Sequence, residues 1–419
     1  MDVCINDILM QTLYADTSLT PLRVARLNSY IDWNSQPSLF KHYPDFLFRY
    51  MYDEMESLKV AELSRCMTSY SKIGGNPYYR LNTPSAGNLH PLELYVQIRG
   101  IKGVISGIYH IDPTEESIVL IREIETEGIE PFVGLTQRLK GMIFVVSMVP
   151  FRSEWKYAER SIRYCYLDAG HQTGAILAAA HALGQKATIL SDIDTLNLNT
   201  YMGFGAQEFA CMAVSIGEVT DKMVNLLHSP LMQVAPTNYY ETINASLNYM
   251  DYEYYTVSYP QMAPCIQNVS PIYKRRSVRF FADSMIKGEL CDYFLKRIEQ
   301  APFPLNASIV LLKNSAREPG VYKQHTLNKG GEYAQTISHF LVDQSFVKHA
   351  AMIFIFTAKA CTPHSLICSG AYAHMLHLEA VEHGLGFTGI GAFYDKKLQD
   401  FLDTQDPILY VCALGEERA

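Results

Sequence analysis

Two hydrophobic patterns alternate along this chain of 419 residues and predict a protein that contains both strands and helices. The continuous apolar runs at 142–149 and 350–356 have the length of buried strands, and they are far too short to span a bilayer. The longer segments 169–190 and 369–391 begin with small and apolar residues at helical spacing and reach a glycine, which is typical of a helix end. The order of these patterns favours an α+β fold with a mixed or antiparallel sheet flanked by helices.

The two predicted helices are related by a constant shift along the chain, which indicates an internal repeat. This shift superposes Gly170 on Gly370, Gly184 on Gly384, and Thr188 on Thr388. Strand landmarks recur in the same order: 107–109 as 320–322, 142–146 as 352–356, and 211–218 as 409–416. We therefore predict two related halves rather than two unrelated domains of similar composition.

The expected domain boundaries follow from the position of the repeat. Residues 1–228 form the first domain together with an N-terminal extension, and residues 269–419 form the second. The connector at 229–268 is rich in proline and tyrosine and has little helical period. Because aromatic residues are scarce in flexible linkers, we expect this connector to be ordered and to wrap around the domains.

Composition and charge exclude several classes of function. The net charge is -8, so neither nucleic acid nor an acidic membrane surface is an expected partner. The nine cysteines are scattered singly, which suits a reducing compartment better than a disulfide framework. The N-terminus lacks the basic stretch of a signal peptide, so the expected location is the cytoplasm. The spacing of His90, His110, His171 and His181 is not that of metal ligands, and no metal site is expected.

The segment 274–279 carries the sharpest candidate binding residues of the second half. In an extended chain alternate side chains lie on one side, so the donors of Arg275, Ser277 and Arg279 are expected to point the same way. Two guanidinium groups with a hydroxyl between them make a suitable clamp for phosphate. A basic cluster is also typical of a solvated surface, and the residue pattern alone leaves both interpretations open.

A stiff loop in the first half is the second candidate segment. Between two prolines it carries small and hydrogen-bonding residues, and its candidate contacts are Pro84, Ser85, Ala86 and Asn88. Such a loop lets a flat ligand approach its backbone, although an ordinary turn before a strand has the same composition. Neither candidate segment occurs in both halves, because 301–308 stands in place of the loop and the first half lacks the Arg-Arg-Ser-x-Arg pattern. One complete site therefore needs both halves.

These segments resemble the flavin-binding segments of the FMN-dependent nitroreductase superfamily, in which the flavin lies at a dimer interface. In that family one subunit supplies an Arg/Ser segment and the other a Pro-Ser-x-x-Asn loop. The resemblance implies two fused nitroreductase-like domains that form an intramolecular pseudo-dimer. It also implies that FMN is bound by Arg275, Arg276, Ser277 and Arg279, by Pro84, Ser85, Ala86 and Asn88, and by a glycine stretch that includes Gly389, Ile390 and Gly391.

Within this superfamily the chain is most similar to the SagB-type, or ThcOx-like, dehydrogenases. The similar blocks lie at 32–37, 40–44, 84–88, 107–113 and 154–160. Members of this subfamily oxidise thiazoline or oxazoline rings in modified peptides to azoles, and an adjacent Lys-Tyr pair is implicated in proton removal. The resemblance implies that Lys156 and Tyr157 are the catalytic residues, since a lysine in an apolar environment can have a lowered pKa. The alternative is that Lys156 only forms an ion pair with Glu154, Glu159 or Asp168 while Tyr157 packs.

Three functions stay open on these grounds. The first is FMN-dependent dehydrogenation of a modified peptide or a small molecule, with other enzymes of a peptide-modifying pathway as partners. The second is NAD(P)H-dependent reduction of a nitro compound, a quinone or an unsaturated bond, and the third is a non-catalytic flavin-binding scaffold. The eroded loop at 301–308 puts a second flavin site in doubt, and further homodimerisation of the fused pair is open. Asp168 is interpreted as a residue that caps or orients the long helix.

Overall fold

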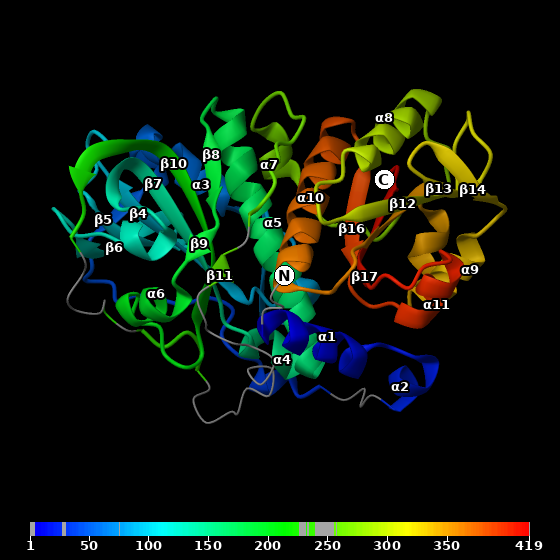
Figure 1. The fold of residues 1–419 in the computed structure, drawn as a ribbon, viewed down its shortest axis with the longest axis horizontal. Helices are drawn as coiled ribbons and strands as arrows, with labels where there is room; N and C mark the ends of the chain where they lie inside the picture. Colours follow the sequence, from blue (N-terminus) through cyan, green and yellow to red (C-terminus); the bar gives the residue numbers. More distant parts are fainter. Residues whose placement is uncertain are drawn as a thin grey trace.

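The computed structural model contains two large β-sheets with a pair of long helices between them (Figure 1). The structure describes residues 5–26, 31–74, 76–225, 232, 234–238, 255–256 and 258–418. No helix in these ranges is long and apolar enough to cross a membrane.

The first sheet has the strand order β1-β6-β5-β4-β7-β10-β8, and all neighbouring strands are antiparallel. Its strands are β1 (Arg49–Met51), β4 (Leu92–Arg99), β5 (Gly107–Asp112), β6 (Ser117–Glu123), β7 (Gln137–Met148), β8 (Ala187–Leu190) and β10 (Phe209–Met223). Alternate residues of β7 pack into hydrophobic clusters on opposite faces of the sheet, for example Phe144 on one face and Val145 on the other. Burial on both faces explains the continuous apolar run in the sequence of this strand.

The second sheet has the strand order β14-β13-β12-β15-β17-β16 and is antiparallel throughout. Its strands are β12 (Asn306–Leu311), β13 (Gly320–Lys323), β14 (Thr326–Gly330), β15 (Met352–Thr357), β16 (Gly386–Ile390) and β17 (Ile408–Gly415). This order repeats that of the first sheet without β1, and the repeated sequence landmarks fall on the corresponding strands β5 and β13, β7 and β15, and β10 and β17. The prediction of two related α+β halves is confirmed.

Helices α5 (Ser161–Ala182) and α10 (Pro363–Glu382) pack against each other at the centre of the molecule (Figure 1). A methyl group at Gly370 would lie 2.1 Å from the carbonyl oxygen of Leu167, and one at Gly170 would lie 2.2 Å from that of Ile367. The two contacts mirror each other, because all four residues correspond in the repeat. The halves are therefore related by a pseudo-twofold axis near the two glycines, as expected of a pseudo-dimer.

One hydrophobic cluster runs through both halves and includes residues from α5, α10 and both sheets. Two smaller clusters cover the outer faces, one on the first sheet and one on the second. The other helices are α1 (Ile5–Thr17), α2 (Pro21–Arg26), α3 (Lys59–Ser64), α4 (Phe151–Tyr157), α6 (Thr195–Tyr201), α7 (Ser270–Lys274), α8 (Gly288–Glu299), α9 (Ala334–Phe340) and α11 (Asp395–Phe401). A hairpin of β2 (Met67–Ile73) and β3 (Asn76–Leu81) leads into the stiff loop that starts at Pro84.

Only parts of the predicted connector lie within the described residues. Strand β11 (Tyr255–Thr256) pairs with β9 (Asp192–Ile193) of the first half. Further along, Tyr259 packs edge-on against His364, and the backbone N–H of Cys265 donates to Glu379 of α10. These contacts fit an ordered segment that passes from the first half to the second. Pro230 and most of the tyrosine-rich stretch fall outside the described residues, and the boundaries at 228 and 269 stay predictions.

Candidate active site

A cavity of about 300 Å³ lies at the junction of the two halves. The first half lines it with Pro84, Ser85, Ala86, Gly87, Tyr157, Tyr164, Leu167 and Asp168. The second half lines it with Ser277, Arg279, Val342, Gln344, Gly389, Ile390, Gly391, Ala392 and Tyr410. The structure therefore brings four separate candidate segments, from both halves, to one cavity. Four of the candidate residues from the sequence are not among its walls: Asn88, Lys156, Arg275 and Arg276.

The loop from Pro84 onwards is held in a special backbone conformation. Gly87, Asn88 and His90 all have positive φ angles, of 66°, 60° and 47°. Ser85 stabilises the turn by accepting a hydrogen bond at Oγ from the backbone N–H of His90, at 3.0 Å. A methyl group at Gly87 would lie 2.5 Å from the hydroxyl oxygen of Tyr157. Glycine is therefore needed here for its backbone angle and for the close approach of the tyrosine.

Neighbouring side chains of segment 274–279 point to opposite sides, as in an extended chain, so Arg275 and Arg276 have different surroundings. Arg275 is buried, and its Nη2 donates to the carbonyl oxygen of Leu81 at 2.9 Å, whereas its Nε and Nη1 have no partner within the described ranges. Burial lowers the pKa of Arg275 to about 10. A buried guanidinium with unpaired N–H groups is costly unless an anion meets it. Arg276 instead faces solvent and forms an ion pair with Glu417 at 2.7 Å.

A second hollow, of about 340 Å³, lies at the Arg275 end of this segment. Its walls include Lys274, Arg275 and Arg276 together with Thr68 and Ser69 of β2. Basic groups and hydroxyls thus gather at one end of the segment, while Ser277 and Arg279 reach the first cavity.

Arg279 is fixed at the cavity wall by a strained turn. Its Nη1 donates to the side-chain oxygen of Gln344 at 3.3 Å, and its guanidinium lies 5.3 Å from the centre of the Phe346 ring. Val342 and Asp343, which come just before Gln344, have φ angles of 58° and 55°. A β-branched residue such as valine rarely adopts this conformation, and such strain gathers at functional sites.

The glycine stretch at the end of β16 is shaped by close contacts. A methyl group at Gly389 would lie 1.7 Å from the hydroxyl oxygen of Tyr410, and one at Gly391 would lie 2.5 Å from the ring of Tyr164. Both tyrosines line the cavity, and the hydroxyl of Tyr164 donates to the carbonyl oxygen of Gly391 at 3.2 Å. Since β16 is the edge strand of its sheet, its backbone can face a ligand.

The predicted catalytic residues Lys156 and Tyr157 are the last two residues of helix α4, and their side chains have different surroundings. Tyr157 lines the cavity and packs edge-on against Tyr164, with 5.1 Å between the ring centres. Lys156 is half-buried, and its Nζ lies 5.1 Å from the ring centre of Trp33 and 5.5 Å from that of Tyr157. Burial lowers the pKa of Lys156, and no carboxylate in the described part of the chain forms an ion pair with it. Ala158, which follows, has φ 48° and ψ -146°, a conformation that alanine rarely adopts.

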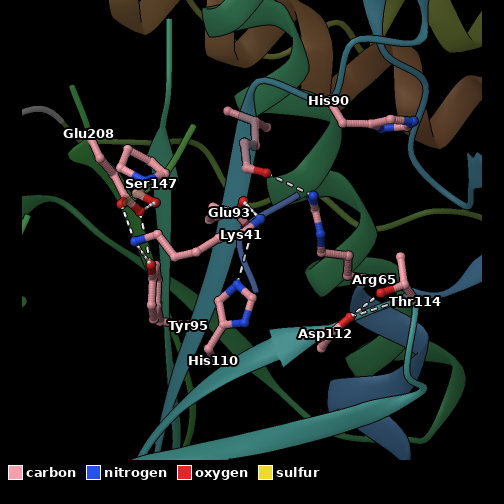
Figure 2. Close-up of polar contacts among 12 residues, drawn as sticks. Lys41, Arg65, His90, Glu93, Tyr95, His110, Asp112, Thr114, Ser147 and Glu208 are labelled. Atoms are coloured by element: carbon pink, nitrogen blue, oxygen red, sulfur yellow. Dashed lines mark hydrogen bonds and ion pairs between the residues drawn. The ribbon is translucent and has the colours of Figure 1, made fainter. Parts of the chain in front are cut away.

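A buried polar network around Glu93 supports the Pro84 loop and helix α4, which both belong to the first half (Figure 2). Glu93 of β4 accepts hydrogen bonds from the Lys41 backbone at 2.8 Å, from His110 at 2.9 Å and from Arg152 at 2.6 Å. Arg152 also donates to the carbonyl oxygen of His90 at 3.0 Å, and it lies in the first turn of α4. Burial alone would raise the pKa of Glu93, but Arg152 and His110 outweigh it and hold the pKa below its usual range. Arg152 thus links the stiff loop to the helix that carries Lys156.

Lys41 forms a second part of this network. Figure 2 shows its ammonium group beside Glu208 and the hydroxyl of Tyr95, which it contacts at 2.8 Å. Glu208 also accepts a hydrogen bond from Ser147 at 2.7 Å. Burial of these groups is tolerated because each finds a partner. The network ties the N-terminal segment to the first sheet.

From the sequence, Asp168 is interpreted as a residue that caps or orients the long helix, and the structure shows that it is not a cap. It lies well inside α5, which begins at Ser161, and its side chain lines the cavity. Ser85 and the backbone N–H of Ala86 form hydrogen bonds with it, while Oδ2 has no partner among the described residues. Burial raises the pKa of Asp168 to about 8. The helix start was hidden because its cap residue, Arg160, provides no side-chain cap.

A further hollow, of about 770 Å³, lies beside strand β8, which corresponds to β16, and its other wall is the connector segment 259–263. Its wall residues His181, Gly184 and Gln185 correspond in the repeat to Val381, Gly384 and Leu385 of the second hollow, and not to the walls of the first cavity. No residue of an Arg-Ser-Arg segment or of a Pro-Ser loop is among the walls described for that hollow. The described residues also contain no group of three or more His, Cys, Asp and Glu side chains that could hold a metal ion.

Comparison with known proteins finds a family likeness in the second half and a likeness of fold over the whole chain. Residues 272–416 match the model of the Nitroreductase family. A candidate nitroreductase from Methanocaldococcus jannaschii is 31% identical over 104 residues, which cover 24% of this chain and 52% of that protein. The chain thus matches about half the length of this curated relative.

Solved structures extend the likeness beyond the second half. The crystal structure of a candidate nitroreductase from Anabaena variabilis superposes with a TM-score of 0.79 and 19% identity, over 98% of this chain and 99% of that one. The E. coli microcin synthetase McbBCD complex aligns with 50% of this chain and 87% of that one, at 15% identity and a TM-score of 0.33. The nitroreductase fold in tandem form, predicted from the sequence, is confirmed by the first of these structures together with the two matching sheets.

Proposed function

We propose that this chain is an FMN-dependent oxidoreductase that holds one flavin in the cavity between its halves. The observation that carries this proposal is the shared cavity, whose walls combine Ser277 and Arg279 of one half with the Pro84 loop of the other. Arg275 lies beside the second hollow and not in the cavity wall, and an anion such as the FMN phosphate would offset the cost of burying its unpaired Nε and Nη1. The nitroreductase fold supports the same cofactor.

Different residues would bind the two ends of FMN. Arg275 and Ser277 would hold the phosphate end, while Arg279, the Pro84 loop and the backbone of Gly389 and Gly391 would hold the ring. Asn88 belongs to this loop but does not line the cavity, and Arg276 is paired with Glu417 in solvent, so we leave both out of the proposed contacts. When bound, FMN supplies an acceptor for a hydride.

We further propose that the reaction is the dehydrogenation of a ring in a peptide-derived substrate. The support is the similarity to SagB-type dehydrogenases together with the position of Tyr157 in the cavity wall. The adjacent Lys156 has a lowered pKa and no carboxylate partner in the described ranges, which suits a group that takes up a proton. Tyr157 lines the cavity while the Nζ of Lys156 lies 5.5 Å from the centre of its ring, so the two side chains are neighbours at the cavity wall.

The Lys156→Ala variant is expected to keep FMN and to lose turnover by about 10²- to 10⁴-fold, the usual effect of removing a general base. The measurement is anaerobic bleaching of the flavin absorbance by a thiazoline-bearing peptide. Lys102→Ala provides a matched control, since the exposed Lys102 lies in the turn between β4 and β5 and is not among the residues that line the cavity. Equal rates for Lys156→Ala and the wild type would remove the catalytic assignment.

A second arm of the same experiment separates the other functions. Rapid bleaching by NAD(P)H, followed by turnover of a nitro compound or quinone, would show a reductase instead. A wild-type protein that binds FMN and reacts with neither reagent would behave as the scaffold of a peptide-modifying complex. Our proposal predicts bleaching by the azoline peptide and slow or no bleaching by NAD(P)H.

A further inference from the structure

A hollow of about 310 Å³ lies in the second half, where β12 begins and where β13 and β15 end, and we call it the β12 hollow. It shares no wall residue with the cavity between the halves. The polar residues of its walls that matter here are Asn306, Ser308, Lys323, Thr357 and Asp406. The oxidoreductase function proposed above uses none of them.

The internal repeat maps the β12 hollow onto the buried network of the first half. Strand β12 pairs with β13 and β15 in the register in which β4 pairs with β5 and β7, and the bulge of β10 recurs in β17. Each polar wall residue therefore corresponds to a member of the network: Asn306 to Glu93, Ser308 to Tyr95, Lys323 to His110, Thr357 to Ser147, and Asp406 to Glu208. All five positions are polar in both halves.

In the first half this position is occupied by Lys41 (Figure 2). The backbone N–H of Lys41 donates to Glu93 at 2.8 Å, and its ammonium group donates to the hydroxyl of Tyr95 at 2.8 Å and contacts Glu208. Lys41 is only 3% exposed. The first-half residues thus form a site for a short piece of chain that presents a lysine, and the chain fills that site itself.

In the second half no described segment of the chain takes the place of Lys41. The described connector lies elsewhere, since β11 pairs with β9 of the first half and 259–263 borders the hollow beside β8. Asparagine, serine and aspartate stand where the first half has glutamate, tyrosine and glutamate, and these smaller side chains leave space. Each still has an oxygen that can accept a hydrogen bond.

The carboxylate of Asp406 is held in place, but its cation can be exchanged. The backbone N–H of Asp406 donates to the hydroxyl of Thr404 at 3.1 Å, which fixes the turn. Its ion pair with Lys359, at 3.2 Å, contributes little, because the side chain of Lys359 is 87% exposed. Lys323 is directed to the carbonyl oxygen of Leu402 at 2.8 Å. With Glu299 also in the wall, the carboxylates outnumber the cation, which favours an ammonium group as the ligand.

We propose that the β12 hollow binds a separate polypeptide through a segment that presents a lysine. The ammonium group of this lysine meets Asp406, as that of Lys41 meets Glu208, and Asn306 accepts a backbone N–H, as Glu93 does. A neutral amide is less costly to cover than a carboxylate, and it can also donate to a peptide carbonyl, which suits a ligand that binds and leaves. The proposal does not depend on the flavin chemistry.

The probe is a fluorescent synthetic peptide, Ser-Leu-Phe-Lys-His-Tyr-Pro, which copies residues 38–44. It is titrated with the full chain, and the fluorescence anisotropy is measured with and without FMN. We expect saturable binding below about 1 mM, and at least tenfold weaker binding when the lysine is acetylated, because the ion pair is lost. Equal binding of the two peptides, or no binding up to about 1 mM, would overturn the proposal whether or not the chain binds FMN.

Two variants locate the binding. Asp406→Asn should weaken binding of the lysine peptide about tenfold and leave that of the acetylated peptide unchanged. Asp403→Asn is the matched control, because Asp403 is exposed in the same loop and is not a wall residue of the hollow. Equal losses in the two variants, or a loss in neither, would contradict a site at Asp406.

Cross-linking of the wild type keeps the test open if Asp406→Asn does not fold. A carbodiimide joins a lysine to a carboxylate that it touches, and mass spectrometry of the digested product identifies the carboxylate. The probe peptide should be joined to Asp406 or Glu299, which both line the hollow. Coupling only to other carboxylates would overturn the proposal.

Discussion

The Asp395→Ala variant is expected to lose about 3–5 kcal/mol of unfolding free energy, because it leaves two buried guanidinium groups without their shared anion. Asp395 at the start of α11 pairs with Arg160 at 3.2 Å and with Arg163 at 3.0 Å. It also accepts a hydrogen bond from the backbone N–H of Leu19 at 2.9 Å. The measurement is urea unfolding of the full chain at pH 7.

The same variant is expected to loosen the cavity. Arg160 donates to the carbonyl oxygen of Gly391, so a guanidinium that loses Asp395 no longer holds the glycine stretch in place. We expect FMN affinity to fall together with stability. Asp400→Ala is the matched control, because Asp400 forms only an exposed ion pair with Lys396 on the same helix. A loss in Asp395→Ala no larger than in this control would contradict the role of the cluster.

The pH dependence of this loss has a definite sign. Burial would raise the pKa of Asp395, but Arg163 and Arg160 outweigh it and lower the pKa below its usual value. A carboxyl with a lowered folded pKa stabilises the fold above its unfolded pKa and loses this effect as the pH falls through the folded pKa. The difference between the wild type and Asp395→Ala should therefore shrink as the solution is made acidic.

The second large effect is expected for Arg152→Met, which should also cost about 3–5 kcal/mol. Arg152 is 1% exposed and joins Glu93, the carbonyl oxygen of His90 and that of Pro236. Without it, burial is expected to raise the pKa of Glu93, so the loss relative to the wild type should grow as pH rises above about 4. Urea unfolding at two pH values measures both the loss and its sign.

Arg152→Met should also reduce FMN retention, because the stiff loop loses its tie to α4. Arg317→Met serves as the control, since the ion pair of Arg317 with Asp292 is partly exposed and such pairs contribute about 1 kcal/mol or less. If Arg152→Met unfolds at the same urea concentration as Arg317→Met, the network in Figure 2 does not support the site as described.

Much of the fold could be predicted from the sequence because its signals are periodic. The apolar runs became β7 and β15 because both faces of these strands are buried. The internal repeat predicted two related halves, and the structure relates them by a pseudo-twofold axis near Gly170 and Gly370, where α5 and α10 touch. The connector gave no such signal, and its boundaries stay predictions.

The site was only partly predictable, for physical reasons that differ between residues. Period-two alternation grouped Arg275 with Ser277 and Arg279, whereas the structure places Ser277 and Arg279 in the cavity wall and Arg275 beside the second hollow. Arg276, which the family resemblance had included as a ligand, faces solvent. The turn at Val342 could not be found, because a β-branched residue gives no sign that it adopts a left-handed backbone. Asp168 was missed because its proximity to the loop depends on tertiary packing alone.

The most direct test of one flavin held between two halves is the absorption spectrum of the purified full chain with flavin quantitation. The chain is incubated with excess FMN and separated from free FMN before the measurement. The cavity shared by Arg279 and the Pro84 loop predicts one FMN per chain, because 301–308 stands in place of that loop in the second half and the first half lacks the Arg-Arg-Ser-x-Arg pattern. A protein that retains no FMN, or one that retains two per chain, would contradict the account.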